Sequence, residues 1–292
     1  MFLILFSLAI SYAAGGSHPN FHRPVWSPDG GQLVFMSDLH GNWELYLMNV
    51  DGSGVQRLTQ NPGFDGYAAF SPDGKTLVFG RDGSLWLLEL VTRRERQLSQ
   101  PQKTYEDLGA SWAPDGHYLV FASNRDGNRE IYRMVPADGR VERLTDRAGS
   151  DGEPIVAPDG NRMAYVSSHE SEHQIRIMDL KSGATRILVS ETENLYGLSF
   201  SPDGQQLAYN GIREGNYEIL MVSLNDGRIR QLTHHPGQDH LAVFSPNGLR
   251  LVFTTDYQER EQIFLLEVAS AERTLIEPRM TLPSLDEPAE KQ

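Results

Sequence analysis

The sequence predicts an all-β protein, a six-bladed β-propeller with four short antiparallel strands in each blade. Three observations lead to this prediction. A Pro-Asp-Gly or Pro-Asn-Gly signature occurs six times, and its prolines are 44, 42, 44, 44 and 44 residues apart. Apolar runs of strand length follow every signature in the same order. The spacing between these runs is constant, except for losses and gains that fall in polar loops, where a repeated scaffold tolerates them.

The first element of each unit is the signature turn. It reads "VWSPDG", "AFSPDG", "SWAPDG", "IVAPDG", "SFSPDG" and "VFSPNG". Proline presets φ for the turn, Asp or Asn bonds the backbone ahead of it, and glycine takes the left-handed position. We therefore expect Gly74, in the second unit, to have a positive φ.

Strands are expected on both sides of each turn. The run after the turn reads "QLVFMS", "TLVFGR", "YLVFAS", "RMAYVS", "QLAYNG" and "RLVFTT". A second run ("ELYLMN" in the first unit) and a short third run ("VQRLT") close the unit. With the residues ahead of the turn this makes four strands, rich in the branched and aromatic residues that strands favour. One large apolar residue stands beside most turns and predicts core between blades: Trp26, Phe70, Trp112, Phe200 and Phe244.

The chain divides into three parts. Residues 1–15 resemble a secretory signal peptide, because an apolar run too short to span a bilayer is followed by small residues. The alternative is a buried or unstructured N-terminal segment. Residues 16–278 form one propeller, with units starting near 20, 64, 106, 150, 194 and 238. Residues 279–292 are expected to be a polar, disordered tail.

Composition excludes several classes of function. The 292 residues carry a formal net charge of −13 and no dense basic run, so we expect no nucleic-acid partner. There is no cysteine, which excludes disulfides, thiolate metal sites and cysteine nucleophiles. No apolar run after the leader has the length of a membrane helix, so no transmembrane segment is expected in the mature chain.

The stretch "HESEH" at 169–173 has the H-E-x-x-H pattern of zinc peptidases. That pattern needs a helix, where residues four apart share one face. In register with the other units, His169 to His173 fall in the polar loop between the second and third strands. We therefore expect a solvated loop and no catalytic zinc. A second group, His234, His235 and His240 in "THHPGQDH", could bind a metal but is expected to be an exposed loop.

A carboxylate recurs at one position of the repeat. Five residues ahead of the apolar anchor, where the chain enters the innermost strand, stand Asp65, Asp107, Asp151 and Asp239. We expect these four to form a partial acidic ring at one mouth of the channel, with Glu106, Glu153, Glu193 and His240 as accessory residues. Such a ring would bind a cation or a basic or amide-rich segment. The alternative is structural, because each Asp can accept hydrogen bonds that attach its loop to the neighbouring blade.

The full unit, "WAPDGHYLVFASNRDGNREIYRMVPADGRVERLT", resembles the TolB-type propeller repeat, a relative of the WD-repeat, and the resemblance covers all six units. It implies a periplasmic location and envelope-protein partners such as a peptidoglycan-associated lipoprotein. In this sequence the units start almost at once, without the α/β domain that precedes them in that family. A similar repeat occurs in propellers fused to prolyl oligopeptidase-type peptidases, but G-x-S-x-G is absent.

These observations predict a non-catalytic scaffold, periplasmic or secreted, that binds a protein or peptide through loops at one mouth of the channel. No catalytic residue is assigned and no cofactor is expected, with a divalent cation at the mouth as the alternative. The alternative function is a propeller enzyme, a saccharide lyase or hydrolase with its site in the channel. A third is a structural module whose partner binds along a blade edge. The fold is compatible with all three.

Overall fold

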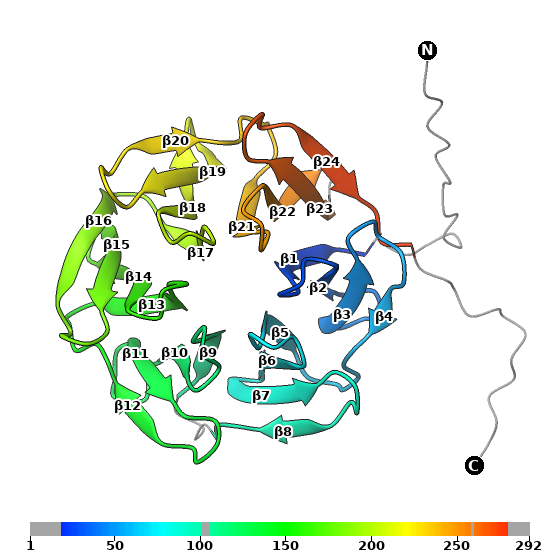
Figure 1. Cartoon of the computed structure of the whole chain (residues 1–292), viewed down its shortest axis with the longest axis horizontal. Helices are drawn as coiled ribbons and strands as arrows, with labels where there is room; N and C mark the ends of the chain where they lie inside the picture. Colours follow the sequence, from blue (N-terminus) through cyan, green and yellow to red (C-terminus); the bar gives the residue numbers. More distant parts are fainter. Residues whose placement is uncertain (1–18, 101–104, 258–259, 280–292) are drawn as a thin grey trace, which may run out of the picture.

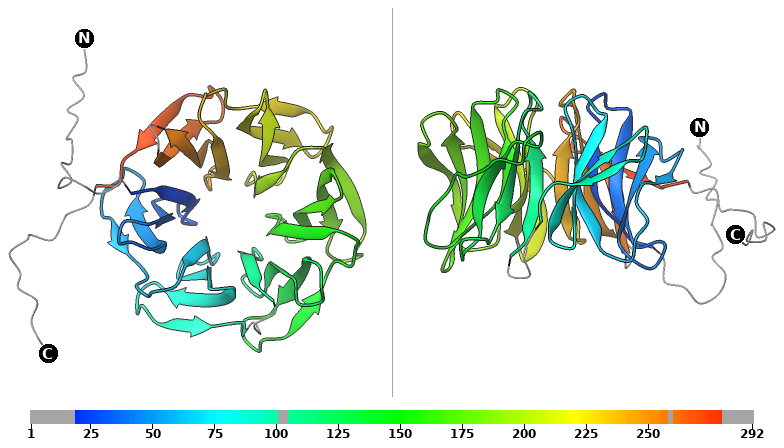
Figure 2. Two further views of the ribbon diagram at one scale, coloured as in Figure 1. Left: turned by 180° about the vertical axis from the view of Figure 1, so that it is seen from behind. Right: turned by 90° about the horizontal axis from the view of Figure 1, so that it is seen from below.

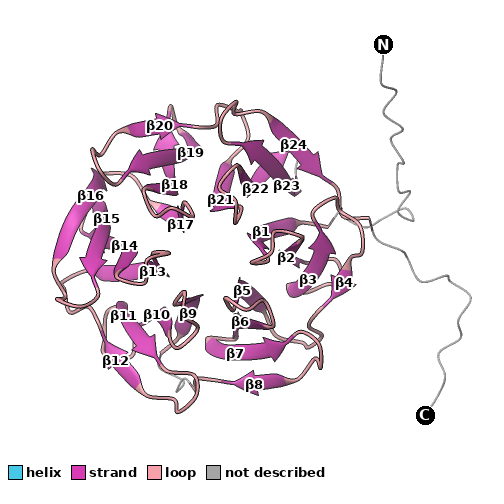
Figure 3. Ribbon diagram, viewed as in Figure 1, coloured by secondary structure: helices cyan, strands magenta, loops and turns pink. Residues whose placement is uncertain are grey.

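The computed structural model describes residues 19–100, 105–257 and 260–279. Within them it contains six four-stranded antiparallel sheets around a central channel, and no helix (Figures 1 and 3). The predicted six-bladed propeller is confirmed. A search of the same residues for long, apolar helices of membrane-spanning length found none. The expected signal peptide and residues 280–292 of the expected tail lie outside the described residues.

Strand bounds follow the repeat. The first two blades contain β1 (Phe21–Trp26), β2 (Gln32–Ser37), β3 (Glu44–Asn49), β4 (Gln56–Arg57), β5 (Asp65–Phe70), β6 (Thr76–Arg81), β7 (Ser84–Glu89) and β8 (Glu95–Gln97). The third and fourth contain β9 (Asp107–Trp112), β10 (Leu119–Ser123), β11 (Glu130–Met134), β12 (Val141–Arg143), β13 (Ser150–Val156), β14 (Arg162–His169), β15 (Glu172–Asp179) and β16 (Thr185–Glu191). The last two contain β17 (Tyr196–Phe200), β18 (Gln206–Arg213), β19 (Asn216–Ser223), β20 (Ile229–Gln231), β21 (Asp239–Phe244), β22 (Arg250–Tyr257), β23 (Arg260–Glu267) and β24 (Arg273–Ile276).

The signature turn joins the innermost strand of each blade to the next strand outward. In the second blade the Gly74 amide donates to the Ser71 carbonyl at 2.9 Å, and the φ of Gly74 is 69°. The Asp73 carboxylate accepts from the Ser71 hydroxyl at 2.7 Å and from the Lys75 amide at 3.1 Å. The turn chemistry predicted from Pro-Asp-Gly is therefore present.

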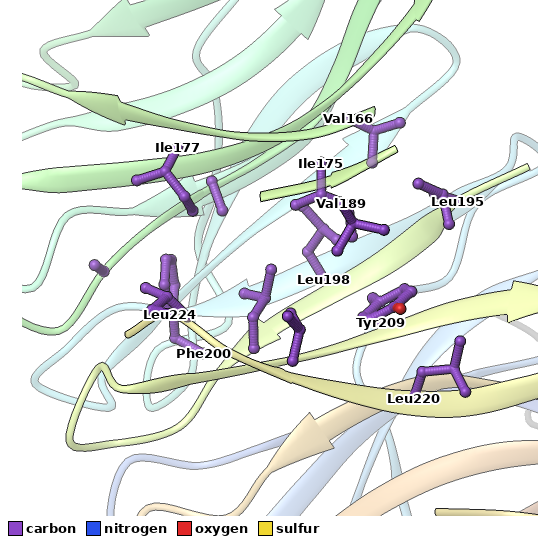
Figure 4. Packing of buried hydrophobic residues seen from close by; sticks show 14 residues of the cluster. Val166, Ile175, Ile177, Val189, Leu195, Leu198, Phe200, Tyr209, Leu220 and Leu224 are labelled. Atoms are coloured by element: carbon purple, nitrogen blue, oxygen red, sulfur yellow. The ribbon is translucent and has the colours of Figure 1, made fainter. Parts of the chain in front are cut away.

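The core lies between neighbouring blades. Figure 4 shows Ile175 and Ile177 of β15 packed toward Leu198 and Phe200 of the next blade, with Tyr209 beside them. Four of the five predicted anchors, Trp26, Phe70, Phe200 and Phe244, are buried, and Trp112 is half-buried. Each sheet thus buries both faces, which explains why its second and third strands are nearly continuous apolar runs.

In three blades, a buried glutamate and its hydrogen-bond partners hold the loop that leads to the innermost strand of the next blade. Glu44, Glu130 and Glu218 are buried at the same register position. Each accepts a hydrogen bond of 2.5–2.6 Å from a buried threonine hydroxyl. Two residues ahead of each glutamate stands an asparagine, whose side-chain amide donates to a glycine carbonyl in the loop that leads to the next blade. In the first and third blades the adjacent backbone carbonyl then accepts from the next blade's aspartate amide, at 3.0 Å for Asp65 and 2.8 Å for Asp151.

The ring closes without exchanging a strand, because β1–β4 and β21–β24 are each complete blades (Figure 1). The first and last blades meet through hydrogen bonds, and this contact is called the seam. The Trp26 indole N–H donates to the Val243 carbonyl at 3.1 Å, and the Arg23 amide donates to the Thr254 hydroxyl at 3.1 Å. The Glu261 amide donates to the Asn20 side-chain oxygen at 3.2 Å.

Candidate functional site: the central channel

The six innermost strands have a bulge at the same place. In every blade the pairing with the second strand shifts register, after the first residue of β17, after the third of β13 and after the second in the other four innermost strands. The residue that follows has a φ between 50° and 68°, and these residues are Arg23, Tyr67, Gly109, Glu153, Gly197 and Leu241. Four of the six carry a side chain in a conformation that costs about 1–3 kcal/mol, so neighbouring contacts must hold it. All six line the channel.

The channel encloses a cavity of about 570 Å³. Its wall is largely apolar and includes Val25, Tyr67, Leu108, Ile155 and Leu198. Seen from the side, the blades form a short cylinder with loops at both ends (Figure 2). One end carries the signature turns. The other end, where the innermost strands begin, is called the aspartate mouth.

One ion pair crosses the channel. Arg23 of the first blade and Glu153 of the fourth approach to 3.9 Å between Nη2 and Oε1. The Arg23 guanidinium also lies 4.2 Å from the centre of the Tyr67 ring, and the Glu153 carboxylate accepts from the Gly197 amide at 2.9 Å. Two opposite charges are therefore held within an apolar wall, each by a further contact from another blade.

The four predicted aspartates stand at the starts of their innermost strands, but their side chains are buried, with 0–1% exposure. Arg81 binds Asp65, Arg125 donates to Asp107 at 2.8 Å, and Arg273 lies 3.7 Å from Asp239. Burial raises the pKa of Asp151, against the hydroxyls of Ser167 and Thr145. No three of the four carboxylates lie within 4.8 Å of one another. Their role in binding stays a prediction, and a partner would reach them only after a local opening.

The accessory residues fall into two groups. Glu106 and Glu193 are exposed. Glu153 is half-buried in the channel, as described above. His240 belongs to a cluster at the seam with His22 and Glu261. Glu261 Oε1 lies 3.5 Å from His22 Nε2 and 3.7 Å from His240 Nε2, and the two imidazole centres are 5.5 Å apart.

Electrostatics set the protonation states of this cluster. Burial, reinforced by the nearby Arg23 cation, lowers the pKa of His22 to about 3 and that of His240 to about 4. Burial raises the pKa of Glu261 to about 7, with further contributions from Asp256 and Asp38. At neutral pH both imidazoles are therefore uncharged, and the carboxyl group exchanges its proton near pH 7.

The H-E-x-x-H stretch forms the tip of the β14–β15 hairpin. His169 pairs with Glu172, Ser168 pairs with His173, and Glu170 takes a φ of 54° in the turn. The two imidazoles thus stand on opposite strands rather than on one helical face. The prediction that the stretch is not helical is confirmed, but its loop is shorter than predicted, because β14 extends to His169 and β15 begins at Glu172. The other histidine group is divided, because His234 is exposed whereas His240 joins the seam cluster.

Sequence reasoning missed His22 and Glu261 as site residues. A signal for His22 was available, since His22 and His240 occupy the same register position in the first and sixth units. In a closed six-unit ring those units are neighbours. The position of Glu261 beside them depends on the hairpin of the last blade and has no sequence signature.

A family model described as the TolB beta propeller domain matches residues 13–84, 80–196 and 153–281. The chain belongs to the TolB β-propeller family. A protein TolB homolog of Chlorobium chlorochromatii is 29% identical over 150 residues, which cover 50% of this chain and 33% of that protein. An uncharacterized peptidase of Bacillus subtilis, YuxL, is 30% identical over 147 residues, covering 48% of this chain and 22% of that protein.

Among solved structures, TolB from Acinetobacter baumannii superposes with a TM-score of 0.73 at 22% identity. The superposition covers 87% of this chain and 62% of that one, and it shows a common fold. The chain matches a third or less of the length of the two sequence relatives.

Proposed function

We propose that this TolB-family propeller is a non-catalytic binding scaffold of the periplasm or cell envelope. It would take an extended segment of a protein or peptide partner into the aspartate mouth of its channel. The observation that carries this proposal is the 570 Å³ cavity, whose apolar wall holds one oppositely charged pair, Arg23 and Glu153. Ligand pockets commonly span about 300–1,000 Å³, so the cavity suits a short segment rather than a folded domain.

Three features of the channel support a peptide ligand. The wall is built from bulged strands, and such a preformed site spares the partner part of the ordering cost of binding. The apolar surface of Val25, Leu108 and Leu198 would cover aliphatic side chains. The exposed carboxylates of Glu106 and Glu193, with a net charge of −13, favour approach of a basic or amide-rich segment.

Family membership supports the proposed location and partner class. The resemblance of the repeat implied a periplasmic protein with envelope partners, such as a peptidoglycan-associated lipoprotein. The specific partner belongs to the proposal.

The test is capture of partners from an envelope extract, followed by direct binding with the purified partner. The double variant Arg23→Gln with Glu153→Gln removes the charged pair that crosses the channel and keeps side-chain length. The matched control is Arg250→Gln with Glu267→Gln, which removes an ion pair of 2.6 Å remote from the channel wall. We expect the channel variant to weaken binding at least about tenfold and the control to leave it unchanged. Equal binding by all three folded proteins would place the contact surface outside the channel.

The alternative is an enzyme acting on a saccharide or peptide in the channel. One group that could serve such chemistry lies at the seam rather than in the lining of the channel cavity, since a carboxyl group of pKa about 7, as in Glu261, can act as a general acid or base. Turnover of an oligosaccharide or peptide by purified protein, abolished by Glu261→Gln, would replace the scaffold proposal with this one.

A further inference from the structure

Three potential metal ligands from three strands converge at the seam. His22 comes from β1, His240 from β21 and Glu261 from β23. Their ligand atoms all lie within 4.8 Å of one another, and no other such group of three exists among residues 19–100, 105–257 and 260–279. Ligands from separate strands of two blades are positioned by the fold itself.

The spacing suits a tetrahedral ion. Ligand atoms about 2.0–2.1 Å from zinc are about 3.3–3.5 Å apart in tetrahedral geometry. The two distances from Glu261 Oε1 to the imidazole Nε2 atoms are 3.5 and 3.7 Å. These two distances are within a few tenths of an ångström of the tetrahedral value, and the ligand atoms of the two imidazoles lie within 4.8 Å of each other. Two His and one Glu are also a donor set found in zinc sites that keep a fourth position open.

One of the imidazole nitrogens that would bind the ion has no other hydrogen-bond partner. His240 Nε2 is inaccessible to solvent and has no hydrogen-bond partner. A buried polar atom without a partner is costly, and a metal ion would satisfy it. The Tyr196 hydroxyl lies 3.5 Å from the other ring nitrogen of His240, where an outer partner can orient the ring.

We propose that His22, His240 and Glu261 form a binding site for one divalent transition-metal ion, with zinc as the first candidate. Imidazole and carboxylate ligands suit zinc and its neighbours better than calcium, which takes six to eight oxygen ligands. The three side chains keep 20%, 17% and 30% of their surface exposed, so the cluster lies close to the protein surface.

Some neighbouring charges favour the binding of a cation at this site, and one opposes it. Asp38 and Asp256 lie close enough to influence Glu261, and they favour a cation. The Arg23 guanidinium opposes it, although that cation is shared with Glu153 and the Tyr67 ring. The site thus has two carboxylates outside the ligand set against one cation.

Such an ion would connect the first blade to the last. His22 belongs to the first blade, while His240 and Glu261 belong to the sixth. Because no strand is exchanged at this seam, metal binding would add a link to the side-chain contacts and to the hydrogen bond from the Arg279 amide to the Gly52 carbonyl. A ligand that binds only the folded state raises its stability. This inference is independent of the proposed peptide-binding function.

The experiment uses the full chain, freed of metal with a chelator and titrated with Zn²⁺ and, separately, with Co²⁺. We expect one equivalent of Zn²⁺ to bind, the melting temperature to rise, and Co²⁺ to give the visible absorption of a tetrahedral site. Glu261→Gln and His240→Asn should each weaken zinc binding at least about tenfold. Loss of a direct ligand should cost no less than loss of an outer-shell partner, which typically lowers metal affinity about 10- to 100-fold. They should also lose the rise in melting temperature.

The matched control is His169→Asn, which removes an exposed histidine of the H-E-x-x-H hairpin. It should bind zinc as the unaltered chain does. Circular dichroism without metal checks that each variant folds, and Glu261→Gln serves if His240→Asn does not. The proposal is overturned if the folded, metal-free chain binds no Zn²⁺ below about millimolar concentration. It is equally overturned if Glu261→Gln binds as well as the control.

Discussion

Arg81 in β6 donates to both carboxylate oxygens of Asp65 in β5, from Nε at 2.7 Å and from Nη2 at 2.8 Å. The same guanidinium binds Glu95 of β8, so one arginine connects the innermost strand of the second blade to its outermost strand. Asp107 has one such bond, from Arg125, and neither buried carboxylate oxygen of Asp151 has a hydrogen-bond partner. Equivalent positions in the repeat therefore differ in how their buried charge is compensated.

Loss of the Asp65 carboxylate should be strongly destabilising. Asp65→Ala leaves the Arg81 guanidinium, only 13% exposed, without its main partner, and breaking a buried ion pair typically costs about 3–5 kcal/mol. Urea denaturation measures the change. Arg250→Ala, which removes a half-exposed ion pair, serves as control and should move the midpoint little. A midpoint for Asp65→Ala equal to that of the control would show that the charge network does not hold the blade.

Asp151 should give stability a specific pH dependence. Burial first, and then the Glu130 charge, raise its pKa, against opposing effects of the Ser167 and Thr145 hydroxyls and Arg147. A carboxyl group with a raised folded pKa binds its proton more tightly in the folded state. The free energy of unfolding therefore falls as pH rises from the ordinary range near 4 through the folded pKa.

Asp151→Asn lacks this fall. Compared with the unaltered chain, the variant should gain relative stability between pH 4 and pH 7, as measured by urea denaturation at both values. A constant difference between the two proteins across this interval would contradict the assignment.

Gly74→Val should destabilise the protein by about 1–3 kcal/mol, because a branched side chain is strained at a φ of 69°. Thermal melting measures the loss. Gly31→Ala, also beside a signature turn, is the control, since its φ is not in the positive region and its new Cβ would come no nearer than 3.5 Å to Asp29. Equal melting temperatures for the two variants would mean that the turn tolerates any residue.

Arg23→Gln should raise zinc affinity with little effect on the free energy of unfolding. Its 3.9 Å ion pair with Glu153 is partly exposed, so stability should change by less than about 1 kcal/mol. Removing the cation beside the seam cluster should raise zinc affinity about two- to tenfold, the size of one screened charge interaction. Isothermal titration with Zn²⁺ checks the second effect, and unchanged or weaker affinity would place Arg23 among the contacts that support the ligands.

The sequence was informative about the channel only in part. The Asp series correctly indicated where four of the six innermost strands begin, to within one residue, because those positions follow the repeat. Burial of the four aspartate side chains was not predicted, because tertiary packing around the start of each strand decides it. The constant spacing of the repeat likewise did not predict the bulge that turns Arg23 and Glu153 toward each other across the channel.

By itself the sequence determined the propeller, its six units and the chemistry of its turns. These features are local, and they repeat with a fixed period that strands and glycine-containing turns require. Only the tertiary structure decided which side chains meet. Ring closure brings His22 beside His240 and Glu261, from opposite ends of the propeller sequence, because the first and sixth blades become neighbours only when all six have packed.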